Sequence, residues 1–295
     1  MITGDWAYRV MEGLRTVRRN LITLIIAGTL LAVAACAEAN SLPVFQAVQT
    51  GPGATFTYGG VWSGGDGVDH TLSAKVSFKA RHGRLKVRLS NTYAGDVNYQ
   101  IELLNAVFFD IAGSVALTPV SATVPAGSTV LFPEVANASV PHDPLPLDVV
   151  GGEFAFRGDL SGAPGDAQYG ISSVGLDLFG PGNLFPPQID LDKPKSPDGS
   201  NYGLTSAGDD PTTGKNPDVK GQEPIIQHEV VFTFCGLPRC FNPSQSIYNV
   251  WFLYGTSWEQ LPPPVEQPPI PEPLTLLGVT AGLAGLGGYL RRRLR

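Results

Sequence analysis

Residues 70–91 carry the strongest folding signal in the chain, a strict alternation of apolar and polar side chains. In HTLSAKVSFKARHGRLKVRLSN, alternate positions of each half are apolar, and Ser, Lys and Arg fill most positions between them. A period of two residues is that of a β-strand with one buried face. His82-Gly83 separates the halves and predicts the turn of a β-hairpin. The predicted inner face consists of Leu72, Ala74, Val76, Phe78, Ala80, Leu85, Val87 and Leu89.

The outer face of this hairpin is predicted to be basic. Between Asn40 and Gln260 the chain has twelve Lys and Arg against twenty-one Asp and Glu, a balance of −9, yet six of these cations lie in the hairpin. Such a patch is a candidate site for an anionic polysaccharide or a lipid headgroup. The alternative is a solvated sheet face whose charges discourage edge pairing. The six cations are Arg81, which is expected in the turn, and Lys75, Lys79, Arg84, Lys86 and Arg88, which are expected on the outer face.

The rest of the body also has the pattern of short strands. Runs rich in Val, Phe, Ile and Thr alternate with turn residues, and the 35 Gly and 26 Pro favour turns over long helices. No helical period persists, so we expect an all-β body over residues 40–260, a single β-sandwich of jelly-roll or Ig-like type. Predicted strands cover residues 101–111, 114–124, 128–132, 153–157, 171–179, 229–235 and 247–254.

A long segment from Gly180 to Pro224 has the composition of a loop. A loop of this length is uncommon in a compact domain unless it binds something. Carboxylates in it are possible oxygen ligands for calcium, but they lack EF-hand spacing, so a solvated acidic loop is the favoured interpretation and no metal site is predicted. The carboxylates are Asp190, Asp192, Asp198, Asp209 and Asp210.

No catalytic constellation is evident, and we expect a protein that is not an enzyme. His228-Glu229 begins like H-E-x-x-H, but Phe232 stands where the second histidine would be needed. Gly170 to Gly175 does not match G-x-S-x-G, and adjacent Asp209 and Asp210 do not establish the geometry of a glycosidase pair. The acidic balance also argues against a general nucleic-acid binder.

Cys235 and Cys240 are five positions apart around Gly236-Leu237-Pro238-Arg239. A turn there could bring the two Cα atoms within disulfide range. In an oxidising compartment the favoured interpretation is a small disulfide loop.

The N-terminal residues 1–39 predict a signal peptide. Arg15, Arg18 and Arg19 precede fifteen uncharged residues, LITLIIAGTLLAVAA, and small residues follow at Ala37 and Ala39. A basic region, a short apolar region and an A-x-A site are the order that signal peptidase recognises. Two alternatives stay open at this end: Met11 as the start, and lipidation of Cys36, because Val33-Ala34-Ala35-Cys36 resembles a lipobox.

The C-terminal end has three parts. Residues 261–270 form a proline-rich stalk, for which polyproline II is the preferred conformation. Pro271-Glu272-Pro273 follows, and residues 274–290 form an uncharged run of the shortest length that crosses a bilayer as a helix. The run is followed by an arginine cluster, which favours a cytoplasmic end. The cluster consists of Arg291, Arg292, Arg293 and Arg295.

Together these three parts resemble the PEP-CTERM sorting signal of Gram-negative bacteria, over residues 271–295. The resemblance implies that an exosortase, a transpeptidase-like membrane enzyme, recognises the tail and cleaves it near Pro271-Glu272-Pro273. Body phrases such as LTPVSATV, YGISSVGLDLFG, NYGLTSAGDD and NVWFLYGTS resemble exosortase-dependent surface proteins of the XDD type. That group implies no defined enzymatic activity.

These features predict an exported surface or extracellular-matrix protein. It would begin as a precursor anchored in the inner membrane and reach the periplasm, the outer surface or the matrix. The expected partners are signal peptidase, an exosortase, the membrane and exopolysaccharide, with no nucleic acid and no required cofactor. A structural or adhesive role in a biofilm is favoured, and the alternative is a carbohydrate-binding module that uses the basic hairpin or a calcium-dependent acidic loop.

Overall fold

The computed structural model describes most of the predicted body. The predicted signal peptide, stalk and sorting tail, including the tail's expected helix, lie outside the described residues. Within the described part, no helix has the length and apolar character needed to cross a membrane. The described residues are 43–50, 53–63, 67–113, 115–132, 148–189, 191, 197 and 199–256.

The chain divides into two units, residues 1–42 with 60–71, and residues 43–59 with 72–295. In the described part of the first unit, the ring centroids of Trp62 and the buried His70 lie 5.4 Å apart. The hydroxyl of Ser63 donates a hydrogen bond of 2.5 Å to Oδ1 of Asp69.

The described strands form two sheets, as the all-β prediction requires. One is seven-stranded, and its order is β2 (Val48–Gln49), β3 (Thr55–Ser63), β4 (Asp69–Arg81), β5 (Arg84–Asn91), β14 (Glu229–Cys235), β7 (Thr118–Val124) and β9 (Asp148–Val149).

The other sheet is eight-stranded and centres on β6 (Leu104–Ile111), which pairs with three strands. Most of its pairs are antiparallel, but β12 and β13 run parallel. Its main path is β1 (Val44–Gln46), β15 (Ile247–Tyr254), β6, β12 (Leu204–Thr205), β13 (Ile225–Gln227) and β8 (Thr129–Leu131), and β11 (Tyr169–Ser172) and β10 (Ala155–Arg157) branch from β6.

Only short helices accompany the sheets in the described residues. The one α-helix, α2 (Pro243–Ser246), begins after Asn242, whose side chain accepts a hydrogen bond from the Ser244 amide. The remaining helices are single 3-10 turns: η1 (Gln100–Glu102), η2 (Gly151–Glu153), η3 (Pro164–Asp166) and η4 (Pro181–Asn183).

The predicted hairpin is confirmed as β4 and β5. The two strands pair antiparallel from Ala74 opposite Asn91 to Arg81 opposite Arg84. His82 and Gly83 both have positive φ angles, 51° and 72°, as both central residues of a type I′ turn must. The predicted inner residues are buried, apart from Ala80, which is half-buried beside the turn.

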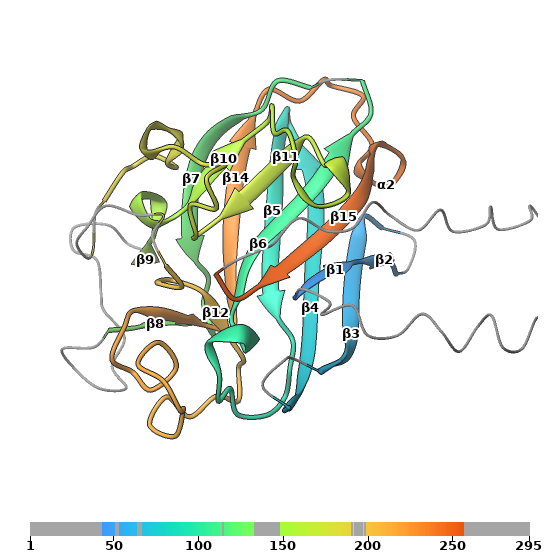
Figure 1. The fold of residues 1–295 in the computed structure, drawn as a ribbon. Helices are drawn as coiled ribbons and strands as arrows, with labels where there is room; N and C mark the ends of the chain where they lie inside the picture. The colour runs from blue at the N-terminus through green and yellow to red at the C-terminus, as the bar shows by residue number, and fades with distance from the viewer. Residues whose placement is uncertain are drawn as a thin grey trace, which may run out of the picture. The chain divides into compact units, whose positions relative to one another are not determined.

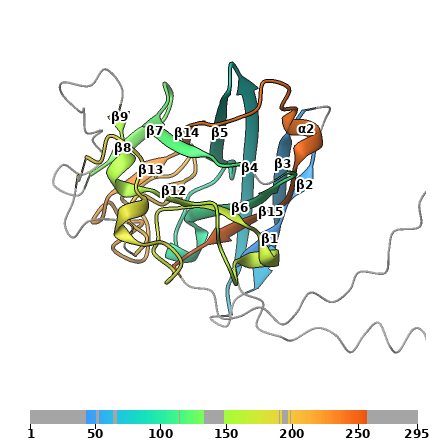
Figure 2. The ribbon, with the colours of Figure 1, turned by 90° about the horizontal axis from the view of Figure 1, so that it is seen from above.

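Aromatic side chains join the two sheets. Phe78 of β4 contacts Phe109 of β6, and their ring centroids are 5.0 Å apart. Phe156 of β10 contacts Phe234 of β14, with a separation of 4.7 Å. Figure 2 shows the strands in two distinct rows, which overlap in the view of Figure 1. One row contains β4, β5, β14 and β7, and the other contains β1, β15, β6 and β12. The inner faces of both sheets therefore contribute to one core.

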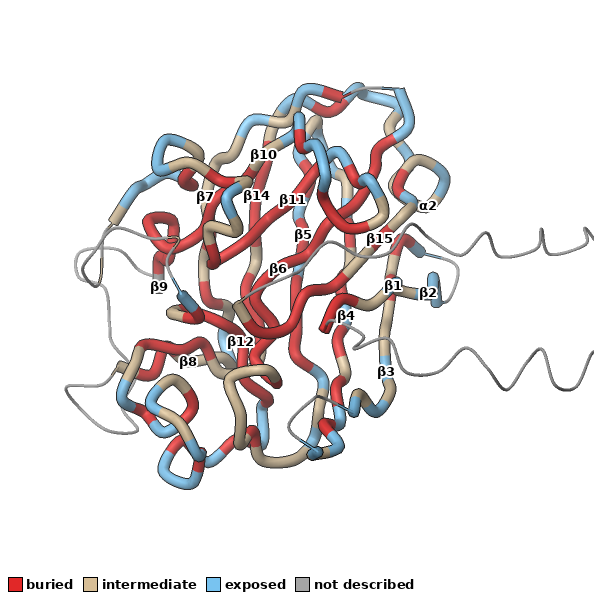
Figure 3. Tube along the Cα trace, in the orientation of Figure 1, coloured by how far each residue is buried: buried red, intermediate tan, exposed pale blue. Residues whose placement is uncertain are grey.

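Strand β6 is buried along its whole length, as Figure 3 shows. Its sequence, LNAVFFDI, is mainly apolar without alternation, which suits a strand that is covered on both faces. Phe109 contacts Phe78 of the other sheet. The neighbouring Phe108 faces Phe179 instead, and their ring centroids are 6.4 Å apart. Phe179 belongs to the irregular segment after β11. That segment therefore covers the second face of β6.

Five of the predicted strands have different bounds in the structure. The structure has β6, β7, β8, β10 and β11 in place of the strands predicted at 101–111, 114–124, 128–132, 153–157 and 171–179. The strand predicted at 171–179 ends at Ser172, because the Ser172 hydroxyl bonds to the amide and carbonyl of Val174 and turns the chain. The strand predicted to start at Ile101 starts at Leu104, because η1 occupies the preceding residues. The predicted strands 229–235 and 247–254 are confirmed as β14 and β15.

We expect Phe234→Ala to lower the free energy of unfolding by about 3 to 5 kcal/mol, because it opens a cavity where strands from both sheets meet. The Phe234 side chain is fully buried and contacts Phe156 and Phe185. Denaturant unfolding of the full chain in mild detergent measures the loss. Tyr248→Ala, at a side chain that is 53% exposed, is the control and should change stability by no more than about 1 kcal/mol.

Candidate functional site

The six predicted cations gather on the outer face of β4 and β5, and we call this surface the basic face. Lys75, Lys79, Arg81, Arg84, Lys86 and Arg88 are all exposed, while the strand residues between them are buried or half-buried. Arg81, expected in the turn, is the last residue of β4. The prediction of a basic outer face is therefore confirmed in position.

The register places like charges directly opposite each other. Lys79 is the cross-strand partner of Lys86, and Arg81 is the partner of Arg84. Directly opposed side chains have Cβ atoms about 5 Å apart, and like charges at this distance are destabilising. Successive outward positions along a strand are about 7 Å apart. The cations recur at this spacing on β5, whereas Ser77 separates Lys75 from Lys79 on β4.

Edge protection does not account for these charges, contrary to one part of the sequence interpretation. Lysines often blunt the exposed edge of a sheet. Here β4 lies between β3 and β5, and β5 lies between β4 and β14. Both strands are internal to the sheet, and β5 is paired on one side with β4 and on the other with β14. The solvated-face interpretation remains, without the edge argument.

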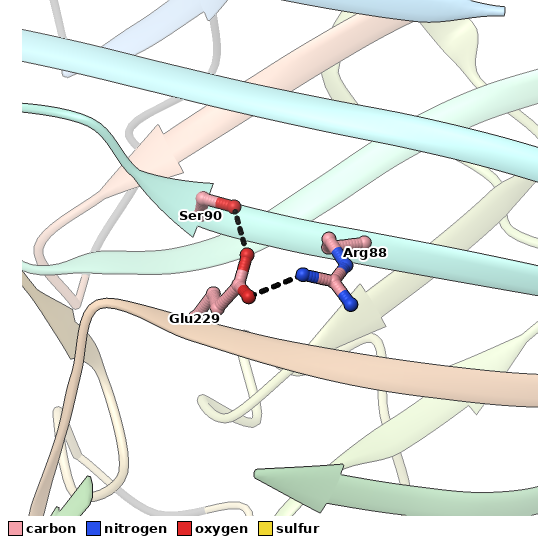
Figure 4. A network of polar contacts seen from close by, with 3 residues as sticks. All are labelled: Arg88, Ser90 and Glu229. Carbon is pink, nitrogen blue, oxygen red and sulfur yellow. Dashed lines mark hydrogen bonds and ion pairs between the residues drawn. The ribbon is translucent and has the colours of Figure 1, made fainter. Parts of the chain in front are cut away.

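One cation of the basic face has a carboxylate partner. Nη1 of Arg88 lies 2.5 Å from Oε1 of Glu229, and the Ser90 hydroxyl donates to Oε2 at 3.0 Å (Figure 4). Within the described residues, the other five cations make no ion pair or side-chain hydrogen bond. The basic face therefore combines five free cations with one held arginine.

Glu229 is the one carboxylate among the residues of β5, β14 and β7 and of β4 from Leu72 onward. It is the cross-strand partner of Ser90, two positions from Arg88 along β5, so all three side chains share the outer face. The side chain of Glu229 is 9% exposed and that of Arg88 is 49% exposed. The carboxylate thus lies below the guanidinium rather than beside it in solvent.

Hydroxyl groups border the basic face. Ser73 and Thr92 share a hydrogen bond of 2.7 Å at the end of the hairpin away from the turn. On the other side, the register places Thr233 of β14 opposite Lys86, and Ser121 of β7 opposite Thr233. Thr92 is exposed and Ser73 and Ser121 are half-buried, whereas Thr233 is buried. A surface of exposed cations bordered by hydroxyl groups suits an extended ligand that has both anionic and hydroxyl groups.

A second polar cluster joins the loop before η1 to the loop after β12. The Val97 amide donates to Oδ1 of Asp209 at 2.9 Å, and the Asp210 amide donates to Oδ1 of Asp96 at 2.9 Å. The Ser206 hydroxyl donates to the Gly95 carbonyl at 2.6 Å. Each loop thus accepts an amide hydrogen of the other through an aspartate, and we call Asp96 and Asp209 the carboxyl pair.

The pKa values of the two carboxyl groups are shifted in opposite directions: that of Asp209 is raised and that of Asp96 is lowered. Burial raises the pKa of Asp209 to about 7; the Thr205 hydroxyl and Val97 amide lower it, and nearby Asp96 raises it further. Burial also works to raise the pKa of Asp96, but hydrogen bonds from Thr213 and Asp210 outweigh it, so this pKa is lowered. The neutral form of Asp209 is therefore accessible near neutral pH.

The acidic residues weighed as possible calcium ligands do not form a cluster in the described part. Asp190, Asp192 and Asp198 lie outside the described residues, while Asp209 is buried and Asp210 is exposed. Among the residues that the structure describes, no group of three or more His, Cys, Asp or Glu side chains could hold a metal ion.

The predicted disulfide is absent from the structure, in which Cys235 and Cys240 are both free thiols. Cys235 ends β14 as the partner of Arg84, and Cys240 is exposed in the following turn. Gly236, with φ of 109°, and the bond from the Leu237 amide to the Gly83 carbonyl fix the chain between them. The turn between the two cysteines is therefore stabilised by this hydrogen bond and not by a disulfide.

The remaining predicted site residues lie outside the described part of the chain. These are the lipidation candidate Cys36 and the sorting residues Pro271, Glu272, Pro273, Arg291, Arg292 and Arg293.

Sequence reasoning missed Glu229 and the carboxyl pair. Glu229 was considered only as part of a metal-binding motif, although its place at the start of an alternating strand assigned it to an outer face. The pairing of β14 with β5, which brings it to Arg88, joins residues 141 positions apart and has no local signal.

Comparisons with known proteins found no match: no family model, no curated protein and no solved structure is similar to the chain at a significant level.

We expect the stability of the protein to fall as pH rises from about 4 to about 7, because Asp209 keeps its proton in the folded state over this window and loses it when unfolded. Asp209→Asn removes the titration and should raise the free energy of unfolding at pH 8 by roughly 1 to 3 kcal/mol, with little gain at pH 4. Denaturant unfolding at both pH values tests this.

Asp177→Asn is the matched control for this charge change. Asp177 is exposed and has φ of 56°, a conformation that asparagine also tolerates. It should leave the pH dependence unchanged. An Asp209→Asn variant that keeps the full pH dependence would contradict the assignment.

Proposed function

We propose that the chain is an exported surface or matrix protein whose body adheres to anionic polysaccharide. In this proposal the body is a β-sandwich, a PEP-CTERM tail directs it to an exosortase, and the mature form acts at the surface of a Gram-negative cell or in its biofilm matrix. The tail resemblance and the independent signal-peptide pattern support the sorting part. The described residues support only the part that concerns the body.

The basic face is the observation that carries the adhesive role. It gathers half of the body's cations onto two internal strands of a protein with an acidic balance. Two like-charge pairs remain opposed there, although a single acidic substitution would relieve each. Charge placed at a cost in stability is more readily explained by binding than by solubility, because the surplus of acidic residues already provides net charge.

A carbohydrate-binding module is the second candidate, and the same surface favours it. The adhesive protein and the carbohydrate-binding module would bind the same ligand and differ only in role, since an adhesive protein also has to bind the matrix polymer. A lipid headgroup offers the same negative charge and is an outcome that the binding experiment separates.

Sorting predicts two processed ends in cells that have an exosortase. Mass spectrometry of the mature protein should find an N-terminus near Ala37 to Asn40, or a lipidated Cys36, and a C-terminus near Pro271. Deletion of residues 271–295 should change both the localisation and the mature C-terminus. Unchanged localisation of this deletion variant would overturn the sorting proposal.

Binding predicts that Lys86→Glu lowers the affinity for polygalacturonate or dextran sulfate at least several-fold, because it reverses a charge at the centre of the basic face. The same change creates an opposite-charge pair with Lys79, so stability should stay equal or rise by up to about 1 kcal/mol. Binding of the full chain in mild detergent and its unfolding are measured side by side. Weaker binding would then not reflect misfolding.

Lys220→Glu makes the same charge change at an exposed lysine outside the basic face. It should leave the affinity close to that of the original protein. Equal losses from both variants would show that only net charge matters. Binding to anionic lipid vesicles but to neither polymer would replace the glycan with a membrane surface.

A further inference from the structure

We propose that Glu229 is a positioning residue that fixes Arg88 as the specificity-determining contact of the basic face. This inference rests on the proposed function, and it adds which residue recognises an individual anionic group. The expected ligand is a linear polysaccharide whose carboxylate or sulfate groups carry paired oxygens. Such a group can bind the two-pronged edge of a guanidinium, which a lysine does not offer.

The contacts of Glu229 use both of its oxygens. Oε1 accepts from Nη1 of Arg88 and Oε2 accepts from the Ser90 hydroxyl (Figure 4). A carboxylate that is only 9% exposed needs such partners, because burial without them is unfavourable. Glu229 also lies within paired β14, opposite Ser90 of β5. The acceptor is therefore fixed both by its backbone and by a second hydrogen bond.

Arg88 is held at one nitrogen and free at the others. Within the described residues, Nη1 is the guanidinium nitrogen that donates a hydrogen bond, and none is found for Nε or Nη2. The side chain is 49% exposed. One end of the planar group is thus tied to the sheet while the opposite edge remains available to an incoming oxyanion.

The other cations of the basic face differ in this respect. Lys79 and Lys86 are opposed like charges with no carboxylate nearby on their own strands, and lysine ends in a flexible point charge. These residues attract any polyanion, whereas the held guanidinium favours one orientation of a bound group. Fixing one long side chain before binding removes an ordering cost that corresponds to roughly two- to tenfold in affinity.

Replacing Glu229 separates positioning from net charge, because the two effects have opposite signs. Glu229→Met removes the acceptor and Glu229→Gln weakens it, and both make the basic face more positive by one charge. Pure electrostatics predicts tighter binding of both variants with a steeper salt dependence. Positioning predicts weaker binding of polygalacturonate or dextran sulfate, by roughly two- to tenfold for Met and by less for Gln.

Two further single variants and one double variant test whether the effect acts through Arg88. Arg88→Lys keeps the positive charge but removes the planar guanidinium with its paired donors, so it should weaken binding by about as much as Glu229→Met. In the double variant the losses should not add, because the two residues act as one unit. Ser90→Ala leaves every charge in place and should give a smaller loss in the same direction. Melting of each variant shows whether it folds.

The outcomes distinguish this inference from the function on which it rests. If the full chain in mild detergent binds neither polymer, the proposed function fails and the inference falls with it. If it binds and Glu229→Met binds equally or more tightly, the positioning role alone is overturned. Weaker binding of a folded Glu229→Met, with no further loss on adding Arg88→Lys, supports it. The polymer that loses more identifies carboxylate or sulfate as the recognised group.

Discussion

The antiparallel pairing of β4 with β5 is the constraint on which the rest of the described structure depends. Because side chains alternate along a strand, this register sends Leu85, Val87 and Leu89 fully into the core and sends the charged residues between them outward. A shift by one residue would exchange the two faces and bury the cations. The apolar core and the basic face are therefore two consequences of a single register, fixed locally by the turn at His82 and Gly83.

Buried polar side chains tie the irregular segments to the two sheets. Asn91, at the end of β5, donates to the carbonyls of Glu102 and Leu204, which belong to two distant segments. Asp110 of β6 accepts from the Gln168 amide and from Asn249. Each of these side chains is buried and has its partners, so it specifies where an irregular segment lies. This explains how a chain rich in Gly and Pro keeps long loops in defined positions.

Local signals were enough to predict the hairpin, β14 and β15, because each has a strand composition and clear turn residues on both sides. They were not enough for β12 and β13, each of two or three residues, whose parallel pairing depends on their neighbours. The candidate site divides in the same way. Its cations follow from alternation in one segment, but Glu229 reaches Arg88 only through long-range strand pairing, and Asp96 meets Asp209 only when two loops fold together.

The internal position of the basic face bears directly on why it exists. Charges that protect an edge belong on edge strands, and β4 and β5 are not edge strands in this sheet. Charges that maintain solubility need no particular register, and the surplus of acidic residues already provides net charge. Neither role explains why like charges lie opposite each other on β4 and β5. Neither explains why Arg88 forms an ion pair with the buried carboxylate of Glu229. An extended anionic ligand lying along the strands would relieve the repulsion between the free cations and use the fixed guanidinium, so it accounts for both features together.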